Sequence, residues 1–241
     1  MKLNTLSRNI FQIVFFTSTT TLAFAGGEII GNGAGESLSA SGPKNAQVNL
    51  FECKFTINLE RNQHIVFNDP DIVIYENDSG ANTKAPAHLW QAETTLGYNW
   101  QFKLDGAPDT YWFGSMCADT AEFPEEFINK KIEASSPGLD LIRESNEAHC
   151  PAKYMDGAWH PSPYATKFHN YIFQDMAGKN WNGFAMALKS SDEKRITSLK
   201  FCLVHKNKIL IGTSESDTPL SLPDDSFQKL IRTLLEIKFI D

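Results

Sequence analysis

Five reactive side chains lie close together in the middle of the chain: His149, Cys150, Asp156, His160 and His169. A cysteine becomes a nucleophile when a nearby imidazole takes its proton and an acid or amide orients the ring. Either Cys150 or the upstream Cys117 could pair with His160 in this way. Asp156 and His149 would complete such a site. This set of residues is compatible with a hydrolase that uses a thiolate.

Other catalytic and metal-binding patterns are weaker. The Gly-x-Ser-x-Gly turn of serine hydrolases is approached only by residues 114–117, Gly-Ser-Met-Cys, which lack the second glycine. No two cysteines have the C-x-x-C spacing of a zinc loop, and His160 and His169 are too far apart to lie one helical turn from each other. We therefore expect a protein that is not an enzyme and holds no metal or cofactor, with the thiol hydrolase as the alternative.

The segment 148–162 carries large amphipathic side chains without a helical or strand period. These and a neighbouring tyrosine form the predicted partner-binding set: Tyr154, Met155, Trp159, His160 and Tyr164. Aromatic residues and methionine are enriched in protein interfaces, so the pattern indicates a loop that binds another protein. The alternative is that Trp159 and Tyr154 fill the edge of the core.

Residues 1–25 are typical of an export signal. Lys2 and Arg8 precede the apolar run 10–16, and the sequence Ala-Phe-Ala at 23–25 fits a cleavage site. The apolar run is too short for a membrane span, which needs about 20 residues. We therefore expect a periplasmic or secreted protein that has no membrane span after signal cleavage.

The chain is acidic. It has 29 Asp and Glu against 22 Lys and Arg, and a formal net charge of -7. Removal of residues 1–25 takes away two positive charges and no negative one, which changes the net charge to -9. Attraction to nucleic-acid phosphates needs clustered Lys and Arg, and the sequence has no such cluster. An acidic surface suits a basic protein partner, or it keeps the protein in solution.

Four cysteines, an even number in an exported chain, predict one or two disulfides. Three pairings are possible. Cys53 lies on the apolar face of a predicted strand and Cys202 lies in another, so a bridge between these two is favoured. Cys117 and Cys150 would then form the second bridge.

The mature chain is expected to begin with a leader and to continue as one domain. Glycine and serine are frequent in 26–45, which favours a flexible segment. The domain then covers 46–241, with a division into 46–120 and 121–241 as the alternative. Alternation, turn residues and cap residues predict the elements of its first two thirds. These are strands over 46–59, 98–104 and 110–116, the last two joined as a hairpin, helices over 124–132 and 162–178, and a helical turn over 139–146.

Residues 195–241 have the clearest pattern. Alternating apolar residues over 195–205 and 208–214 predict two strands joined by the tight turn Lys206-Asn207. Apolar residues at helical spacing over 227–235 predict an amphipathic helix, and 237–240 reads as a closing strand. A further strand over 181–188 enters the same sheet. The expected fold class is α+β: an antiparallel sheet with helices packed on one face, stabilised by disulfides.

These C-terminal elements also resemble a known family. The run Lys-Phe-Cys-Leu-Val at 200–204, the following strand, the helix 227–235 and the final Ile-Lys-Phe at 237–239 are similar to the ending of exported PsbP/Mog1-like α/β sandwich domains. Some immunity proteins that protect bacteria from envelope-acting toxins of type VI secretion are similar in architecture. The resemblance implies an immunity or inhibitor protein, and it carries no functional residue to a position in this sequence.

The favoured hypothesis is an exported, non-enzymatic protein that binds a protein partner. The acidic mature chain, the aromatic segment and the missing catalytic signature agree with the resemblance on this point. One alternative is a cell-envelope hydrolase with the site around Cys117 or Cys150. The other is a small-ligand or envelope-structural module.

Overall fold

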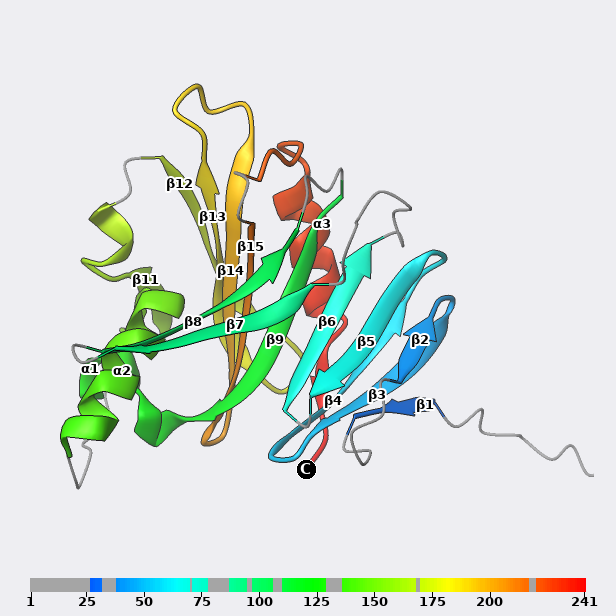
Figure 1. Ribbon diagram of the computed structural model, residues 1–241, viewed down its shortest axis with the longest axis horizontal. Helices are drawn as coiled ribbons and strands as arrows, with labels where there is room; N and C mark the ends of the chain where they lie inside the picture. The colour runs from blue at the N-terminus through cyan, green and yellow to red at the C-terminus, as the bar shows by residue number, and fades with distance from the viewer. Residues whose placement is uncertain are drawn as a thin grey trace, which may run out of the picture.

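The computed structural model describes residues 27–31, 38–69, 71–77, 87–94, 97–105, 110–128, 136–167, 170–216 and 220–241. The predicted signal, 1–25, and His169 lie outside these residues. Within them the chain forms mostly antiparallel β-structure with three α-helices (Figure 1). None of these helices is long and apolar enough to cross a membrane.

The elements keep the labels of Figure 1. The strands are β1 (Glu28–Ile30), β2 (Ser39–Ser41), β3 (Lys44–Leu50), β4 (Cys53–Leu59), β5 (Gln63–Asp69), β6 (Ile72–Asn77), β7 (His88–Thr94), β8 (Gly97–Leu104), β9 (Trp112–Asp119), β10 (Ala152–Met155), β11 (Ala158–Pro161), β12 (Tyr171–Ala177), β13 (Asn182–Lys189), β14 (Ile196–His205), β15 (Lys208–Ser216) and β16 (Lys238–Phe239). The helices are α1 (Glu125–Ile128), α2 (Pro137–His149) and α3 (Ser226–Leu235), and two 3-10 turns cover Thr120–Glu122 and Ala165–Lys167.

A large sheet forms the centre of the molecule. Its strands lie in the order β12-β13-β14-β15-β9-β6-β5-β2, with every neighbouring pair antiparallel. The pair β7–β8 extends it from the end of β15, to which β8 is parallel. A separate four-stranded sheet, β1-β3-β4-β16, shares a core with the large one, and β10–β11 is a hairpin of its own.

The central sheet is buried on both faces. On β14, Leu199, Phe201 and Leu203 enter one core, while Cys202 and Val204 enter the other. Successive side chains of a strand point to opposite faces, so a strand covered on both sides has apolar residues at consecutive positions. The sheet is therefore the middle one of three layers.

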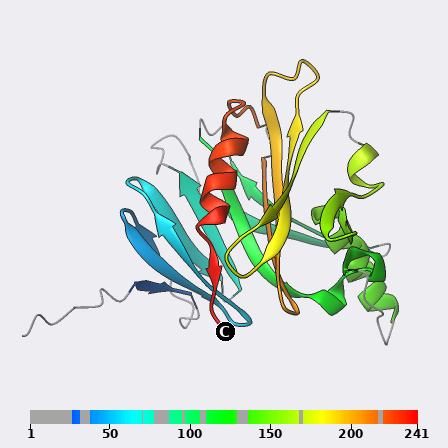
Figure 2. The same ribbon diagram turned by 180° about the vertical axis from the view of Figure 1, so that it is seen from behind.

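The first core lies between the central sheet, the four-stranded sheet and α3. The helix contributes the predicted apolar stripe to it: Phe227, Leu230, Ile231 and Leu234. Figure 2 shows α3, in red, lying along this side of the central sheet. Phe239 of β16 packs on Phe55 of β4, with ring centroids 6.1 Å apart, and this contact joins the C-terminus to the four-stranded sheet.

The second core lies on the other face, beneath β8, α1, α2 and the β10–β11 hairpin. Trp100 and Phe102 of β8 and Phe127 of α1 belong to it. Gly114 of β9 allows the ring of Phe102 to approach the sheet, because a Cβ there would lie 2.1 Å from that ring. The antiparallel sheet is thus confirmed, whereas the prediction of helices on one face is only partly right, since α3 and α1 contribute to opposite cores.

One disulfide ties each outer layer to the central sheet. Cys53 of β4 is bonded to Cys117 of β9, and Cys150, which follows α2, is bonded to Cys202 of β14. The predicted disulfides are confirmed, but the favoured pairing of Cys53 with Cys202 and Cys117 with Cys150 is wrong. Cys53 and Cys202 lie in different cores, with the central sheet between them.

The N-terminal region is more regular than predicted. Part of the expected leader forms β1 and β2, which pair with β3 and β5. The segment 46–59 is a hairpin and not one strand, because β3 and β4 pair through the two-residue turn Phe51-Glu52. Phe51 is exposed, yet in the sequence it continues the apolar alternation of β4, and this hid the turn.

Two other predictions are wrong. β8 pairs with β7 and with the end of β15, and does not form a hairpin with β9. The helix expected over 162–178 is a 3-10 turn followed by β12, which pairs with β13 along its whole length. Apolar residues at helical spacing misled the prediction here, because pairing with a neighbouring strand overrode the local pattern.

The C-terminal predictions are confirmed. β13, β14 and β15 form in sequence order, and the turn Lys206-Asn207 joins the last two. α3 and β16 follow, although the side chain of Asp225 makes no cap hydrogen bond and instead pairs with Lys229 at 2.7 Å. α1 lies within the helix predicted over 124–132, of which residues 129–132 lie outside the described part.

Removing either disulfide should destabilise the fold by about 2–4 kcal/mol, because each crosslink closes a long loop in the unfolded chain. The sequence separations are 64 and 52 residues. Urea unfolding of Cys53→Ala/Cys117→Ala and of Cys150→Ala/Cys202→Ala measures the loss. Amide hydrogen exchange should then rise in β3 and β4 for the first variant and in α2 for the second. Equal loosening of both layers in both variants would contradict this assignment.

Candidate functional site

The predicted Cys/His site is not assembled in the structure. Cys117 and Cys150 are both oxidised, in disulfides that lie in different cores. His160 is exposed on β11, and Asp156 is exposed in the preceding turn. Ser115 is 1 % exposed within β9 and cannot serve as a nucleophile. Because all four cysteines are in disulfides, no thiol is left to activate, and the structure does not support the thiol hydrolase.

His149, the last residue of α2, is buried against β8. Its ring stacks on that of Trp100 with centroids 3.7 Å apart. Nε2 lies 2.6 Å from the Trp100 carbonyl oxygen, and Nδ1 lies 2.8 Å from the Ser145 carbonyl oxygen. Burial lowers the pKa of His149 to about 4 and Lys200 acts in the same direction, while the two carbonyl acceptors oppose the shift. Burial thus favours the uncharged ring at neutral pH, which has one N–H and donates to only one of the two carbonyl oxygens.

The segment predicted as an aromatic loop forms a tight hairpin. β10 and β11 pair through the turn Asp156-Gly157, whose φ angles are +53° and +84°. Positive φ at both central residues is typical of a type I′ turn, for which Asp-Gly is a preferred sequence. Because side chains alternate along each strand, the hairpin divides the predicted binding residues between an inner and an outer face.

Trp159 lies on the inner face of the hairpin. It is 3 % exposed, packs between Phe127 and Phe184, and donates a hydrogen bond from Nε1 to Asn182 Oδ1 at 2.9 Å. Tyr154, its partner across the hairpin, is half-buried against it, with ring centroids 5.2 Å apart. These two side chains therefore fill the edge of the core, which was the alternative considered for them.

Met155 and His160 lie on the outer face of the hairpin. Met155 is 48 % exposed and His160 is also exposed. Tyr164, just beyond the hairpin, is half-buried, and the ammonium of Lys167 lies 4.7 Å above its ring centroid. Of the five residues predicted to bind a partner, the structure therefore leaves Met155 and His160 exposed on one small surface.

The helix α2, beside the hairpin, buries its polar side. Its buried residues are Arg143, Ser145, Asn146 and His149. Arg143 donates from Nε and Nη2 to the Ala121 carbonyl oxygen at 3.2 Å each, and Asn146 Nδ2 donates to the Glu122 carbonyl oxygen at 3.0 Å. Hydrogen bonds to backbone carbonyls therefore hold this helix on the 3-10 turn at 120–122.

Both ends of α2 are fixed as well. Ser136 caps the N-terminus, where its Oγ accepts a hydrogen bond from the Leu139 amide, and Pro137 occupies the first helical turn. At the C-terminus, Cys150 carries the disulfide to β14. The sequence predicted only a helical turn over 139–146, and Ser136-Pro137 was the start signal that could have extended it to the observed thirteen residues.

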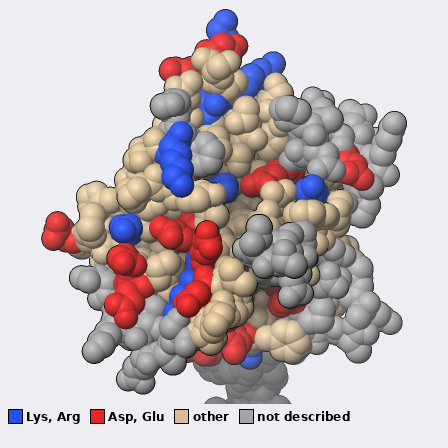
Figure 3. Space-filling model, turned by 60° about the vertical axis from the view of Figure 1, so that its left-hand side comes forward, with Lys and Arg blue, Asp and Glu red and all other residues tan. Residues whose placement is uncertain are grey.

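The exposed surface of α2 includes Asp140, Leu141, Ile142 and Glu144. The two apolar side chains are 36 % and 37 % exposed. The carboxylates of Asp140 and Glu144 lie one helical turn apart, and that of Asp140 pairs with Arg143 Nη1 at 3.3 Å. Figure 1 shows α1, α2 and the β10–β11 hairpin together at one end of the central sheet, and Figure 3 shows acidic side chains gathered on this side. This end of the molecule thus presents an apolar pair in an acidic surrounding.

No protein-family model matches the sequence, and no curated protein or solved structure is significantly similar to it.

Mutations on the two faces of the hairpin should differ in their effect on the free energy of unfolding. Trp159→Ala should lower the free energy of unfolding by about 3–5 kcal/mol, because it leaves a cavity between Phe127 and Phe184. Met155→Ala should change it by less than about 0.5 kcal/mol, because the side chain is exposed. Urea unfolding measures both values, and a large loss for Met155→Ala would show that the outer face is packed against another part of the chain.

His149 should make the stability of the fold decrease as the pH is lowered. Its pKa in the fold, about 4, is below the ordinary 6.5, so the unfolded chain binds more protons between these values. This contribution is present above pH 6.5 and is lost on acidification toward pH 4, by about 3 kcal/mol in total. The difference in unfolding free energy between wild type and His149→Gln, measured across this range, isolates it. Wild-type stability that rises relative to the variant on acidification would mean that the carbonyl acceptors outweigh burial.

Proposed function

We propose that this protein is an exported binding protein, most concretely an immunity or inhibitor protein that neutralises an envelope-acting toxin or enzyme. The observation that carries the proposal is that α2 buries Arg143 and Asn146 and exposes Leu141 and Ile142. Apolar side chains gain free energy when they leave water, so an exposed pair on a firmly held helix favours a surface that another protein covers.

The helix is also suited to binding because it is already ordered. Arg143 and Asn146 fix it to backbone carbonyls, and the Cys150–Cys202 disulfide fixes its end. Association loses free energy when a partner has to order a loop or a helix. Because α2 is already fixed along its length and at its C-terminal end, binding avoids most of this loss.

The expected partner carries basic side chains around an apolar patch. Glu144 of α2 and Glu125 and Glu126 of the neighbouring α1 are exposed, as is Asp140, whose charge is partly compensated by Arg143 at 3.3 Å. Complementary charge speeds the encounter of two proteins and disfavours partners of the same sign. The acidic net charge of the mature chain acts in the same direction.

A stable interface needs more area than one helical turn provides, roughly 800 Å² on each partner. Met155 and His160 on the outer face of the β10–β11 hairpin are exposed at the same end of the molecule. We include them in the proposed surface, which keeps part of the site predicted from the sequence and places its centre on α2.

The predicted export signal and the family resemblance also support the proposal. Disulfides persist in oxidising compartments, and two are present here. The sequence of residues 1–25 is typical of an export signal. An inhibitor in the periplasm would meet a toxin that acts on the envelope, as the similarity to PsbP/Mog1-like immunity proteins suggests.

The test uses one exposed position on α2 and a matched one elsewhere. Ile142→Asp should weaken binding to the captured partner by tenfold or more, because a buried hot-spot side chain contributes about 2 kcal/mol. Ile29→Asp, on β1 and 58 % exposed, should bind as the wild type does. The wild-type mature chain first captures partners from a periplasmic extract, and each candidate is then purified and measured by calorimetry and by co-expression.

The proposal requires that a captured partner be toxic to the envelope and that wild type, but not Ile142→Asp, protect cells from it. Thermal unfolding should show that both variants are folded. Equal binding and protection by the two variants would remove α2 from the interface. Recovery of no partner, with no protection in co-expression, would overturn the inhibitor function itself.

A further inference from the structure

A polar pocket of about 670 Å³ lies on the other side of the central sheet, between α3 and the ends of β4, β5 and β6. Its lining is mostly polar and comes from α3, from β4 to β6 and from Tyr111. Small-molecule sites commonly have volumes of about 300–1,000 Å³, so the size fits a small ligand. The pocket shares no residue with the exposed surface of α2, and it carries a proposal that is independent of the inhibitor function.

A chain of hydroxyl groups forms the buried side of this pocket. Tyr75 OH lies 3.1 Å from Tyr111 OH, which lies 2.7 Å from Thr233 Oγ1. Burial raises the pKa of Tyr75 far above its ordinary value, so this hydroxyl keeps its proton. Because hydroxyl groups donate and accept, the chain can present a donor or an acceptor to a ligand at Tyr111 and Thr233, the two members that line the pocket.

Two of the four charged groups around the pocket are engaged within the protein. Lys229 pairs with Asp225 at 2.7 Å. The carboxylate of Glu236 accepts a hydrogen bond from Asn58 Nδ2 at 2.9 Å. These contacts fix the rim of the pocket and leave their charges partly compensated.

The other two charges, Arg232 and Glu60, are the informative pair. Both are exposed side chains of the lining, one from α3 and one from the β4–β5 connection. Neither forms an ion pair within the part of the chain that the structure describes, and they do not pair with each other within 4.0 Å. A guanidinium and a carboxylate thus share one pocket with space between them.

We propose that this pocket binds a small zwitterion, an amino acid or short peptide with free termini. Its carboxylate would pair with Arg232, whose guanidinium can donate two parallel hydrogen bonds. Its ammonium group would pair with Glu60. The amides of Gln63 and Asn77 also line the pocket, with Gln63 Nε2 donating to Asn77 Oδ1 at 3.4 Å and Gln63 Oε1 accepting from the Glu60 amide at 2.8 Å. Together with the hydroxyls of Tyr111 and Thr233, their remaining donors and acceptors suit a peptide bond.

The test compares ligands that differ only at their ends. Calorimetry of the mature wild-type chain should detect binding of alanine, dialanine or trialanine. N-acetylation and C-amidation of the peptide that binds should each lower its affinity by roughly tenfold to hundredfold, the usual range for a charged hydrogen bond. Arg232→Gln should remove the difference in affinity between the free acid and the amide. Glu60→Gln should remove the difference in affinity between the free amine and the acetylated peptide.

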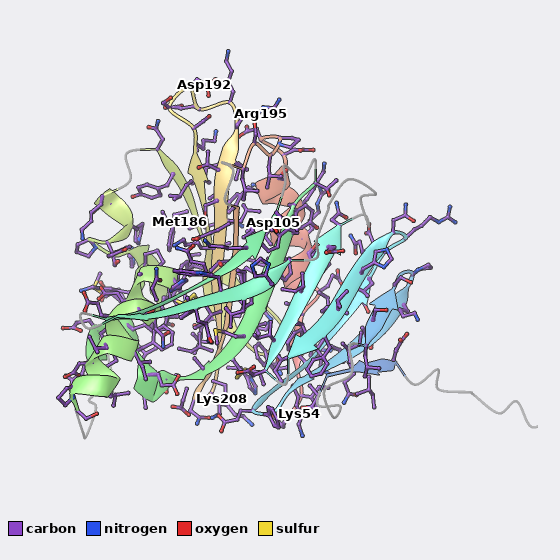
Figure 4. The ribbon with its side chains drawn as sticks, viewed as in Figure 1. Lys54, Asp105, Met186, Asp192, Arg195 and Lys208 are labelled. Atoms are coloured by element: carbon purple, nitrogen blue, oxygen red, sulfur yellow. A yellow bond between two sulfur atoms is a disulfide. The ribbon has the colours of Figure 1, made fainter. Side chains whose placement is uncertain are left out.

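Lys54→Gln is the matched control, since it removes an exposed charge from β4 without touching the pocket. Figure 4 shows Lys54 at the end of the molecule near Lys208, and it lies four residues, about 13 Å along the strand, from Asn58. This variant should bind the peptide as wild type does.

Three results would overturn the proposal. The first is no detectable binding of any of the three probes at millimolar concentration. The second is loss of binding on amidation only, which would indicate a simple anion site. The third is equal weakening by Lys54→Gln and Arg232→Gln, which would indicate non-specific charge attraction. Failure here leaves the α2 surface untouched, because the two sites share no residue.

Discussion

Burial of the central sheet on both faces is the constraint on which the other features depend. A sheet covered on one side can leave alternate positions polar, whereas here Leu203 and Val204, neighbours on β14, enter different cores. The protein must therefore supply two covering layers. It uses a second sheet and α3 for one face, and β8, two helices and a hairpin for the other. The disulfides Cys53–Cys117 and Cys150–Cys202 each fasten one of these layers to the sheet.

The two covering layers are held in different ways, and this difference produces the two proposed sites. α3 packs through an apolar stripe, so its polar residues Lys229 and Arg232 line the rim of a pocket. α2 is attached through hydrogen bonds from Arg143 and Asn146 to backbone carbonyls, and its apolar residues Leu141 and Ile142 are exposed. Buried polar groups are costly unless they are paired, and these side chains have acceptors in the 3-10 turn.

Much of the fold could be predicted where contacts are local. β13, β14, β15 and α3 follow from apolar periodicity because sequence neighbours in this region are also neighbours in space. The predictions failed where a distant segment decided the outcome. β8 lies beside β7 and β15 instead of β9, and β12 is a strand because β13 offers it a partner. The turn at Phe51 was missed because an exposed aromatic residue continued the apolar alternation of the next strand.

The sequence by itself determined that the chain is acidic, that its four cysteines form disulfides, and that its C-terminal part is an antiparallel hairpin followed by an amphipathic helix. These properties depend on composition and on periods within a few residues. Only the tertiary structure decided which cysteines pair, that Trp159 is buried, and that Leu141 and Ile142 face outward. The physical reason is that the period of a helix or strand shows which residues share a face, while the packing of distant segments decides which face is covered.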